Sequence, residues 1–405
     1  MHRTRPNRWR VGILALLALG AALIWPLLPA MPPQEVSLSA PAPLVERLRL
    51  HRPPVHLLWS LDEQYLAIPC SGDRKTEIVV LDMREGKEVA RFPAPEDERP
   101  RAIWGEDERT HAVWAEDGRL WIRGKREWRV YAPPFQETRP TVSIPDRLPP
   151  GTSLEEFDWA FRPEGELLVT VREQSLLQNG ASLPLGAPRN YRLAIRKQDK
   201  VLYDQPFIPR EQGDQRHAGS LTFSPDARKL AFTVDGWVGL ETPGAEELWT
   251  VDLATNTVRC LHVGKSEWWR IFDFPVQHMT PSWTPDGREL VVGDAKFGLE
   301  RIDAETGWRW HLLPPEWGSE PQAGRDWVAY LRFKDYAGFG MRNLFREEVA
   351  LVSRDGRRWG KLPGPISSQS VYEYAWNREG TQLALLTSGL QGKDSTLLVW
   401  KAPAN

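Results

Sequence analysis

The feature that most constrains the fold is a motif that recurs along the chain. In "PSWTPDGREL", residues 281–290, an aromatic residue is followed three positions later by an acid, then by polar residues and an apolar run. The six clear copies begin at Trp59, Trp104, Phe161, Phe223, Trp283 and Trp376. A seventh, degraded copy lies in "GSEPQAGRDWVAYLRF". Self-similarity of this kind indicates a repeat architecture, in which each copy is one supersecondary unit.

The second half of each unit also recurs. The segments "EIVVLDMREGKEVARF", "ELWTVDLATNTVRCL", "LERIDAETGWRWHLL" and "EVALVSRDGRRWGKL" all read as a strand, a polar turn and a strand. Each unit therefore has four strands, A to D, in about 40 to 60 residues, which is typical of a propeller blade. We predict an all-β chain that forms a β-propeller of seven four-stranded blades. Six or eight blades stay open as alternatives, because the sixth copy is degraded.

The blades need one another for stability. A four-stranded meander cannot bury both faces alone, so we expect the aromatic positions, among 20 tryptophans in all, to pack between blades. The last unit, "TLLVWKAPAN", ends where strand C should stop, which would leave an unpaired edge. The segment "PLVERLRL", residues 43–50, is predicted to supply the missing outer strand, so that both ends of the chain build the last blade.

The repeated acids are predicted to form turns and not a catalytic site. They are Asp62, Asp107, Glu164, Asp226, Asp286 and Glu379, one in each clear copy. In the hairpin at 281–290, Pro285 suits the second turn position, Asp286 can bond to the backbone beyond it, and Gly287 accepts a positive φ. An active site needs one special constellation, whereas these acids occur once in each unit.

No motif for catalysis or cofactor binding is recognisable. The chain has no G-x-S-x-G, H-E-x-x-H, paired C-x-x-C or phosphate-binding glycine loop, and no two of its 8 histidines have a metal-ligand spacing. We therefore predict no catalytic residue, no metal and no cofactor. A site assembled at the axis from several blades would leave no local motif, so a hydrolase or lyase acting on a sugar or ester stays the alternative.

Loop lengths favour binding on one face. The A–B and C–D turns are short, whereas the long connections are all of the B–C and D–A class, and long loops on a rigid scaffold commonly carry binding sites. Trp and Arg dominate binding hot spots, and two long loops combine them with other aromatic residues. The candidate binding residues are Trp268, Trp269, Arg270, Phe272, Phe274 and His278 in one loop, and Tyr336, Phe339 and Arg342 in another. The alternative is that these loops fold over the propeller as a minor core.

The N-terminus predicts a membrane location. Residues 1–10 are basic and residues 11–30 are uncharged, which suits a cytoplasmic start and a membrane anchor with the remainder exported. A cleaved signal peptide, which would give a secreted protein, is the alternative. A Pro-rich linker at 31–42 then leads to the propeller domain at 43–405. The formal net charge of −2 argues against nucleic acid as a partner. Cys70 and Cys260 are predicted to be buried free thiols.

The segments "FSPDARKLAFT" and "WTPDGRELVV" resemble the WD40-like repeats of the TolB type, also called PD40 repeats. The resemblance covers most of residues 55–400 and implies the blade architecture, but no activity, because such repeats occur in proteins of unrelated function. We expect a non-catalytic envelope protein, extracytoplasmic or periplasmic, that binds a protein or an envelope polymer through its long-loop face. A sensor of a small ligand would have the same sequence features.

Overall fold

The computed structural model describes the chain between residues 33 and 403, with gaps, and these residues form strands and turns but no helix. The described ranges are 33–51, 54, 56–70, 76–94, 112–115, 117–123, 127–137, 142–143, 157–162, 165–174, 190–197, 200–207, 215–226, 228–237, 245–265, 281–294, 298–312, 318–334, 346–363, 371–387 and 394–403. The predicted all-β class is confirmed. The predicted anchor, residues 11–30, lies outside these ranges, and inside them no helix has the length and apolar character that crossing a membrane requires.

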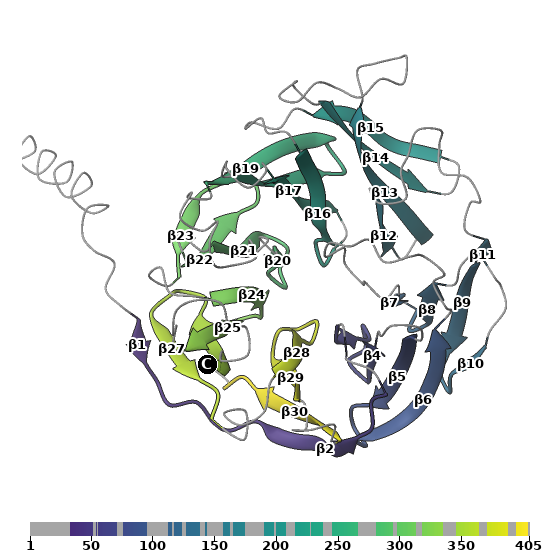
Figure 1. The fold of residues 1–405 in the computed structure, drawn as a ribbon, viewed down its shortest axis with the longest axis vertical. Coiled ribbons are helices and arrows are strands. Elements are labelled where there is room, and N and C mark those ends of the chain that lie inside the picture. The colour runs from purple at the N-terminus through teal and green to yellow at the C-terminus, as the bar shows by residue number, and fades with distance from the viewer. Residues whose placement is uncertain are drawn as a thin grey trace, which may run out of the picture.

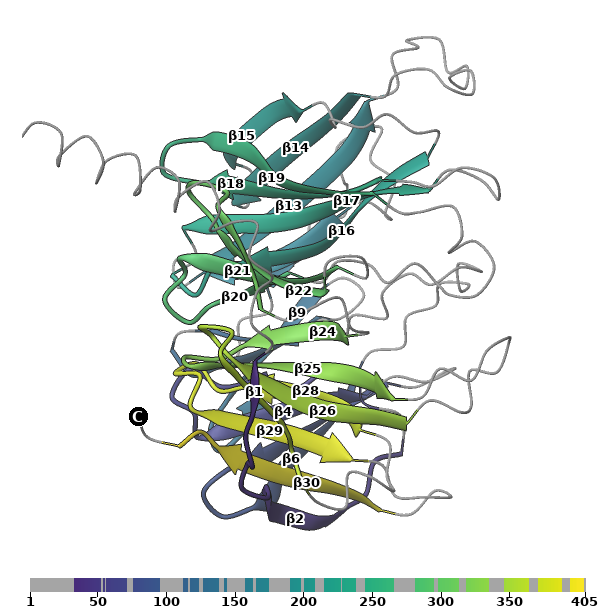
Figure 2. The ribbon, with the colours of Figure 1, turned by 90° about the vertical axis from the view of Figure 1, so that its left-hand side faces the viewer.

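The strands form seven small sheets, which are arranged in a ring (Figure 1). All strand pairs are antiparallel except the pair of β1 with β27. We number the sheets 1 to 7 in chain order of their innermost strands. In each sheet the first strand of the unit lies nearest the centre of the ring, and the later strands lie further out. Seen from the side, the sheets run across the thickness of the ring (Figure 2).

The first four sheets follow the chain in order, except that in sheet 2 both β10 and β11 pair with β9. Sheet 1 contains β3 (Leu58–Trp59), β4 (Tyr65–Cys70), β5 (Thr76–Asp82) and β6 (Lys87–Ala94). Sheet 2 contains β7 (Ala112–Trp114), β8 (Leu120–Arg123), β9 (Glu127–Ala132), β10 (Gln136–Glu137) and β11 (Val142–Ser143). Sheet 3 contains β12 (Phe157–Arg162), β13 (Gly165–Gln174), β14 (Asn190–Lys197) and β15 (Lys200–Phe207). Sheet 4 contains β16 (Gln215–Phe223), β17 (Lys229–Trp237), β18 (Ala245–Asp252) and β19 (Thr257–Lys265).

Sheet 5 follows the chain in order, whereas sheets 6 and 7 each also contain a strand from the N-terminal part of the chain. Sheet 5 contains β20 (Ser282–Trp283), β21 (Glu289–Asp294), β22 (Gly298–Asp303) and β23 (Arg309–His311). Sheet 6 contains β24 (Gly318–Ala323), β25 (Trp327–Lys334), β26 (Arg346–Ser353), β27 (Arg358–Lys361) and β1 (Gln34–Glu35). Sheet 7 contains β28 (Val371–Trp376), β29 (Gln382–Thr387), β30 (Ser395–Lys401) and β2 (Ala42–Leu48).

Strand β2 is the outer strand of sheet 7. It pairs antiparallel with β30, with Ala42 opposite Val399 and Leu48 opposite Ser395. This segment overlaps residues 43–50, which the sequence predicted for the same place. Just before it, β1 lies parallel to the outer edge of sheet 6, and the Trp400 indole donates to the Ser39 carbonyl at 3.1 Å. The chain start therefore covers two sheet edges that would otherwise have unpaired backbone groups.

The inner hairpin of sheet 5 explains why the repeat contains a hydroxyl residue and an acid. Thr284 Oγ1 donates to Asp286 Oδ1 at 2.6 Å and accepts the Glu289 backbone N–H at 3.1 Å. Asp286 Oδ1 also accepts the Arg288 backbone N–H at 3.1 Å, and Gly287 has a φ of 66°. The same set of bonds joins Ser60 to Asp62 and Ser224 to Asp226. The turn role predicted for Asp286 is confirmed.

Two copies use other residues for this role. In sheet 7, Asn377 Oδ1 accepts the backbone N–H groups of Thr381 and Gln382 at 2.8 and 2.9 Å, in place of Glu379. In sheet 2, Asp117 bonds to the Arg119 backbone N–H at 3.1 Å, so the turn lies ten positions after the predicted acid Asp107. Asp107 and Glu164 lie outside the described residues.

Tryptophans at the start of the repeat connect neighbouring sheets. Each donates its indole N–H to a backbone carbonyl in the innermost strand of the preceding sheet, at 2.9 to 3.2 Å. The pairs are Trp59 with Ala375, Trp114 with Leu58, Trp283 with Thr222, and Trp376 with Gln322. Trp114, and not the predicted Trp104, therefore begins the second copy. A hydrogen bond of this kind contributes roughly 1 kcal/mol, and it also fixes the spacing of adjacent sheets.

The hairpin of the sixth copy lies directly against the Trp376 indole of the next sheet. This hairpin, β24 to β25, has Ala323 where other copies have Trp or Phe, and it has Gly324 where the copies of sheets 1, 4 and 5 have Ser or Thr. A Cβ on Gly324 would lie 2.7 Å from Cε2 of the Trp376 indole. The indole of sheet 7 therefore packs directly on this backbone, and no larger residue fits there.

Apolar side chains fill the spaces between sheets. One cluster joins sheets 6 and 7 and includes Trp327, Trp376 and Trp400, and others join sheets 7 and 1, 1 and 2, 4 and 5, and 5 and 6. In the first cluster, the Trp327 and Trp400 rings meet edge to face at 6.3 Å. The prediction that the repeat aromatics pack between sheets is confirmed for the described tryptophans that begin a copy.

The two cysteines are free, as predicted. Cys70 is buried in the cluster between sheets 7 and 1, and burial raises the pKa of its thiol to about 12. Cys260 is only partly buried. The high thiol pKa makes Cys70 a packing residue and a poor nucleophile.

Candidate functional site

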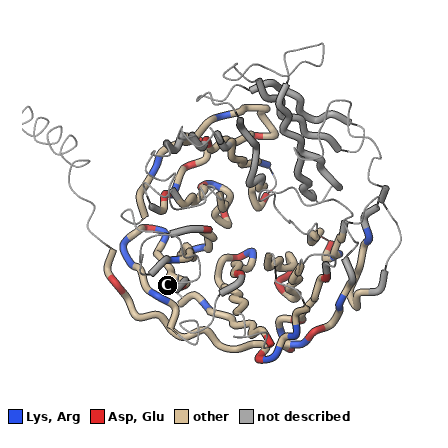
Figure 3. Tube along the Cα trace, viewed as in Figure 1, with Lys and Arg blue, Asp and Glu red and all other residues tan. Residues whose placement is uncertain are grey.

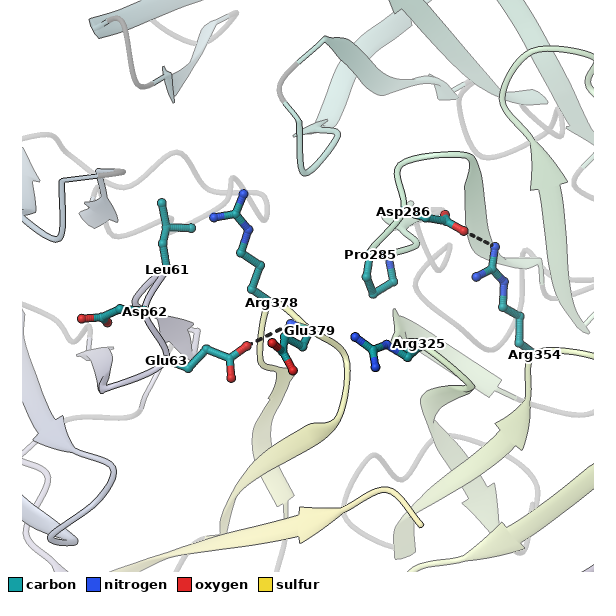
Figure 4. Close-up of a pocket in the computed structure, with 9 residues that line it drawn as sticks. All are labelled: Leu61, Asp62, Glu63, Pro285, Asp286, Arg325, Arg354, Arg378 and Glu379. Atoms are coloured by element: carbon teal, nitrogen blue, oxygen red, sulfur yellow. Dashed lines mark hydrogen bonds and ion pairs between the residues drawn. The ribbon is translucent and has the colours of Figure 1, made fainter. Parts of the chain in front are cut away.

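A cavity of about 650 Å³ opens near the centre of the ring, on the face that carries the short turns. It is lined by Leu61, Asp62, Glu63, Pro285, Asp286, Arg325, Arg354, Arg378 and Glu379. These residues come from turns of sheets 5, 6, 7 and 1, which follow one another around the ring (Figure 4). We call this cavity the axial pocket.

In four of the sheets, the same position of the inner turn faces the axial pocket. Leu61, Pro285, Arg325 and Arg378 each lie two residues after the start of their copy, and all four line the pocket. This is the second position of the turn, as shown by the Gly380 N–H, which donates to the Asn377 carbonyl at 2.9 Å across Arg378. The residue at this position therefore decides the chemistry at the centre of the short-turn face.

Arg354 fixes the outer part of the pocket wall. It lies in the turn between β26 and β27, and its guanidinium donates to Glu289 Oε2 at 2.7 and 3.0 Å and to Asp286 Oδ2 at 2.9 Å. Burial alone would raise the pKa of Asp286, but hydrogen bonds from Thr284 and Arg354 outweigh it and hold this pKa below its ordinary value. Asp286 thus serves the turn with one oxygen and joins sheets 5 and 6 with the other.

Glu63 fixes the boundary between sheets 7 and 1. Its carboxylate accepts the Asn377 side-chain amide at 2.7 Å and the Glu379 backbone N–H at 3.0 Å. Glu63 has a φ of 59°, in the left-handed region, and this backbone conformation is uncommon for residues other than glycine. The two hydrogen bonds that Glu63 accepts from sheet 7 offset the energetic cost of this backbone conformation.

Arg325 and Arg378 are the exposed arginines of the pocket. Both are exposed, and neither guanidinium forms a hydrogen bond or an ion pair with another residue that the structure describes. In Figure 4, Arg325 points into the space between Glu379 and Pro285, and Arg378 extends toward Leu61. The Arg325 backbone N–H donates to the Gly380 carbonyl at 3.0 Å, so the two turns that carry these arginines are bonded to each other.

Two glutamates lie on the innermost strands of sheets 6 and 7. Glu320 has a φ of 52° in an irregular stretch of β24 between Ser319 and Gln322, and its carbonyl accepts the Tyr374 hydroxyl. Burial, followed by repulsion from Glu320, raises the pKa of the partly buried Glu373 to about 9. Glu320 itself is exposed, so the perturbed acid of this pair is Glu373. A perturbed acid beside an irregular strand is a recognised sign of a functional region.

The binding residues predicted from the long loops lie outside the described residues. They are Trp268, Trp269, Arg270, Phe272, Phe274 and His278, with Tyr336, Phe339 and Arg342. The described strand ends nonetheless fix where these segments attach. Residues 266–280 connect Lys265 at the end of β19 to Ser282 at the start of β20, at the opposite end of β20 from the turn at Asp286.

The axial pocket was missed by the sequence reasoning, which assigned the short turns to structure alone. The available signal was the Arg at the second turn position of two successive copies, where other copies have Pro, Leu or Glu. Basic and acidic positions are mixed along the described part of the ring (Figure 3), so overall charge does not mark the pocket. Among the described residues, no group of three or more His, Cys, Asp or Glu could hold a metal ion.

Comparisons with protein-family models and with curated proteins find no match to this chain. The resemblance to TolB-type repeats therefore stays a prediction.

Proposed function

We propose that the chain is a seven-bladed β-propeller of the TolB-like type that serves as a non-catalytic binding protein. Residues 11–30 would anchor it in the membrane, with the propeller on the extracytoplasmic side. Its long-loop face would bind a protein or a cell-envelope polymer. The observation that carries the proposal is the interlocked centre of the ring, where indole donors and the Glu63 and Arg354 contacts join adjacent sheets. Such a frame holds its loops in fixed relative positions, which reduces the entropic cost of binding.

The pairing of β2 with β30 supports closure of the ring. In a closed propeller, the first and last sheets are held together by a strand from the other end of the chain, and opening the ring would expose the core between sheets 7 and 1. The seven sheets agree with seven blades, and the degraded sixth copy has a hairpin of its own.

The binding function is tested by capture from cross-linked membranes. The full-length chain should recover one specific partner, and the double substitution Trp268→Ala and Trp269→Ala should abolish recovery. The matched control is Trp308→Ala with Trp310→Ala, which removes two exposed tryptophans from the turn before β23 and from β23 itself. Equal loss in both double variants, or no loss in the first, would count against the long-loop face.

A second candidate function, an enzyme at the axis, is favoured by Glu320 and Glu373. A carboxyl group that stays protonated at neutral pH can act as a general acid, and a second acid nearby could complete a hydrolase or lyase site for a sugar or ester. The test is hydrolysis of nitrophenyl glycosides and esters by the purified chain. Activity that Glu373→Gln and Glu320→Gln each remove would establish this function and replace the non-catalytic one.

A further inference from the structure

The axial pocket carries two arginines at a position where the fold does not require them. The second position of these turns favours proline, which pre-sets the backbone, and Pro225 and Pro285 occupy it in sheets 4 and 5. Arg325 and Arg378 replace it in sheets 6 and 7. Since neither turn needs a guanidinium, the two arginines call for an explanation other than folding.

The two arginines are held close together. The Arg325 backbone N–H donates to the Gly380 carbonyl at 3.0 Å, and Gly380 belongs to the same turn as Arg378. A Cβ at Gly380 would collide with the Arg325 backbone, so the turns approach as closely as a glycine allows. Two guanidinium groups on such turns repel each other unless a counter-charge lies between them.

The acids of the pocket only partly supply this counter-charge. Asp62 and Asp286 accept turn hydrogen bonds, and Asp286 also pairs with Arg354. Glu63 accepts two bonds from sheet 7. The donors to Asp62 and Glu63 are uncharged groups, so these carboxylates keep their charge, and the lining holds four acids and three arginines. Glu379 is the fourth acid, and it lies beside Arg325 in Figure 4. Of the three arginines, Arg354 is the one with an ion-pair partner among the described residues, so Arg325 and Arg378 are the guanidinium groups left to meet an anion.

We propose that the axial pocket binds a small oxyanion, a carboxylate or phosphate compound, through the guanidinium groups of Arg325 and Arg378. Guanidinium forks match the paired oxygens of these groups better than any other side chain does. The volume of about 650 Å³ falls in the range of small-molecule sites, and the apolar side chains of Leu61 and Pro285 also line the pocket, near Arg378 and Arg325 respectively (Figure 4). This site is on the other face from the proposed partner-binding loops, so the two proposals can fail separately.

The test is isothermal titration of the full-length chain in detergent with citrate and with inorganic pyrophosphate, at constant ionic strength. Arg325→Gln and Arg378→Gln should each weaken binding about tenfold, the effect of losing roughly 1.4 kcal/mol. Glu379→Gln should strengthen binding, because it removes a competing carboxylate. The matched control is Arg357→Gln, which removes the same charge from a short turn but from a side chain that is 85% exposed and does not line the pocket.

Each outcome of this titration either supports the anion site or overturns it. Tighter citrate than pyrophosphate assigns the ligand to carboxylates, and the reverse assigns it to phosphates; both support the site. Absence of measurable binding by either anion overturns the proposal, as does weakening by Arg357→Gln equal to that by Arg325→Gln. Arg378→Lys keeps the charge without the fork and should lie between the native chain and Arg378→Gln, which guards against a variant that merely unfolds.

Discussion

Glu373 should make the free energy of unfolding depend on pH. Burial and the nearby Glu320 raise its pKa from an ordinary 4.5 to about 9. Because the folded chain holds this proton more tightly than the unfolded chain does, the contribution of Glu373 is most favourable below pH 4.5. It is lost progressively as the pH rises toward 9.

The size of the effect follows from the two pKa values. Between them, each pH unit costs about 1.36 kcal/mol, so at pH 7 the native chain has lost about 3 kcal/mol relative to pH 4.5. Glutamine has nearly the same shape as a protonated glutamate and carries no charge at any pH. Glu373→Gln should therefore match the native chain in stability near pH 4.5 and exceed it by about 3 kcal/mol at pH 7.

Urea unfolding followed by tryptophan fluorescence measures this difference directly, since the chain has 20 tryptophans. Subtracting the native curve from that of Glu373→Gln at each pH cancels the titration of all other groups. Glu320→Gln is the companion variant, because it removes the repulsion and should reduce the slope of the native curve. A stability difference that stays constant from pH 4.5 to pH 8 would refute the assigned burial of Glu373.

Two further predictions concern contacts between sheets. Gly324→Ala should destabilise the chain by about 1 to 3 kcal/mol, because the new methyl group would overlap the Trp376 indole. In the background of Trp376→Leu that cost should shrink, and urea unfolding of the four chains in a double-mutant cycle measures the coupling. Arg354→Gln should cost about 1 to 3 kcal/mol, because Glu289, which is 12% exposed, loses its donor. Arg357→Gln on the neighbouring turn position should be nearly neutral in the same measurement.

The repeat made most of the fold predictable. Its alternation, turn residues and period indicated an all-β chain, and the seven sheets follow the copies in order. Even the missing outer strand was predictable, because an unpaired edge after β30 requires a partner and the apolar pattern near Val45 supplies one. These features depend on backbone hydrogen bonding and on the alternation of apolar and polar residues along each strand. Such alternation can be recognised in a short stretch of sequence.

The residue at which the second copy begins was not predictable in the same way. Trp104 and Trp114 both precede acidic, polar stretches, so pattern alone favours neither. The choice is made by the indole N–H of Trp114, which reaches the Leu58 carbonyl of sheet 1 at 2.9 Å. A hydrogen bond between residues 56 positions apart leaves no mark in the local sequence. The same holds for Gly324, because the need for a glycine there becomes clear only once the Trp376 indole is in place.

The acids of the repeat show why frequent residues can hide a site. Asp286 was predictable as a turn residue because Thr284 and Arg288 satisfy one of its oxygens within the hairpin. Its second oxygen faces Arg354 from another sheet, and that contact gives the turn a place in the pocket wall. The fold thus fixes an acid in the turns of sheets 1, 2, 4 and 5 and leaves the position before that acid free to vary. The copies can therefore differ at that position, as Arg325 and Arg378 show. Through such differences a symmetric scaffold can acquire a ligand preference without any loss of turn geometry.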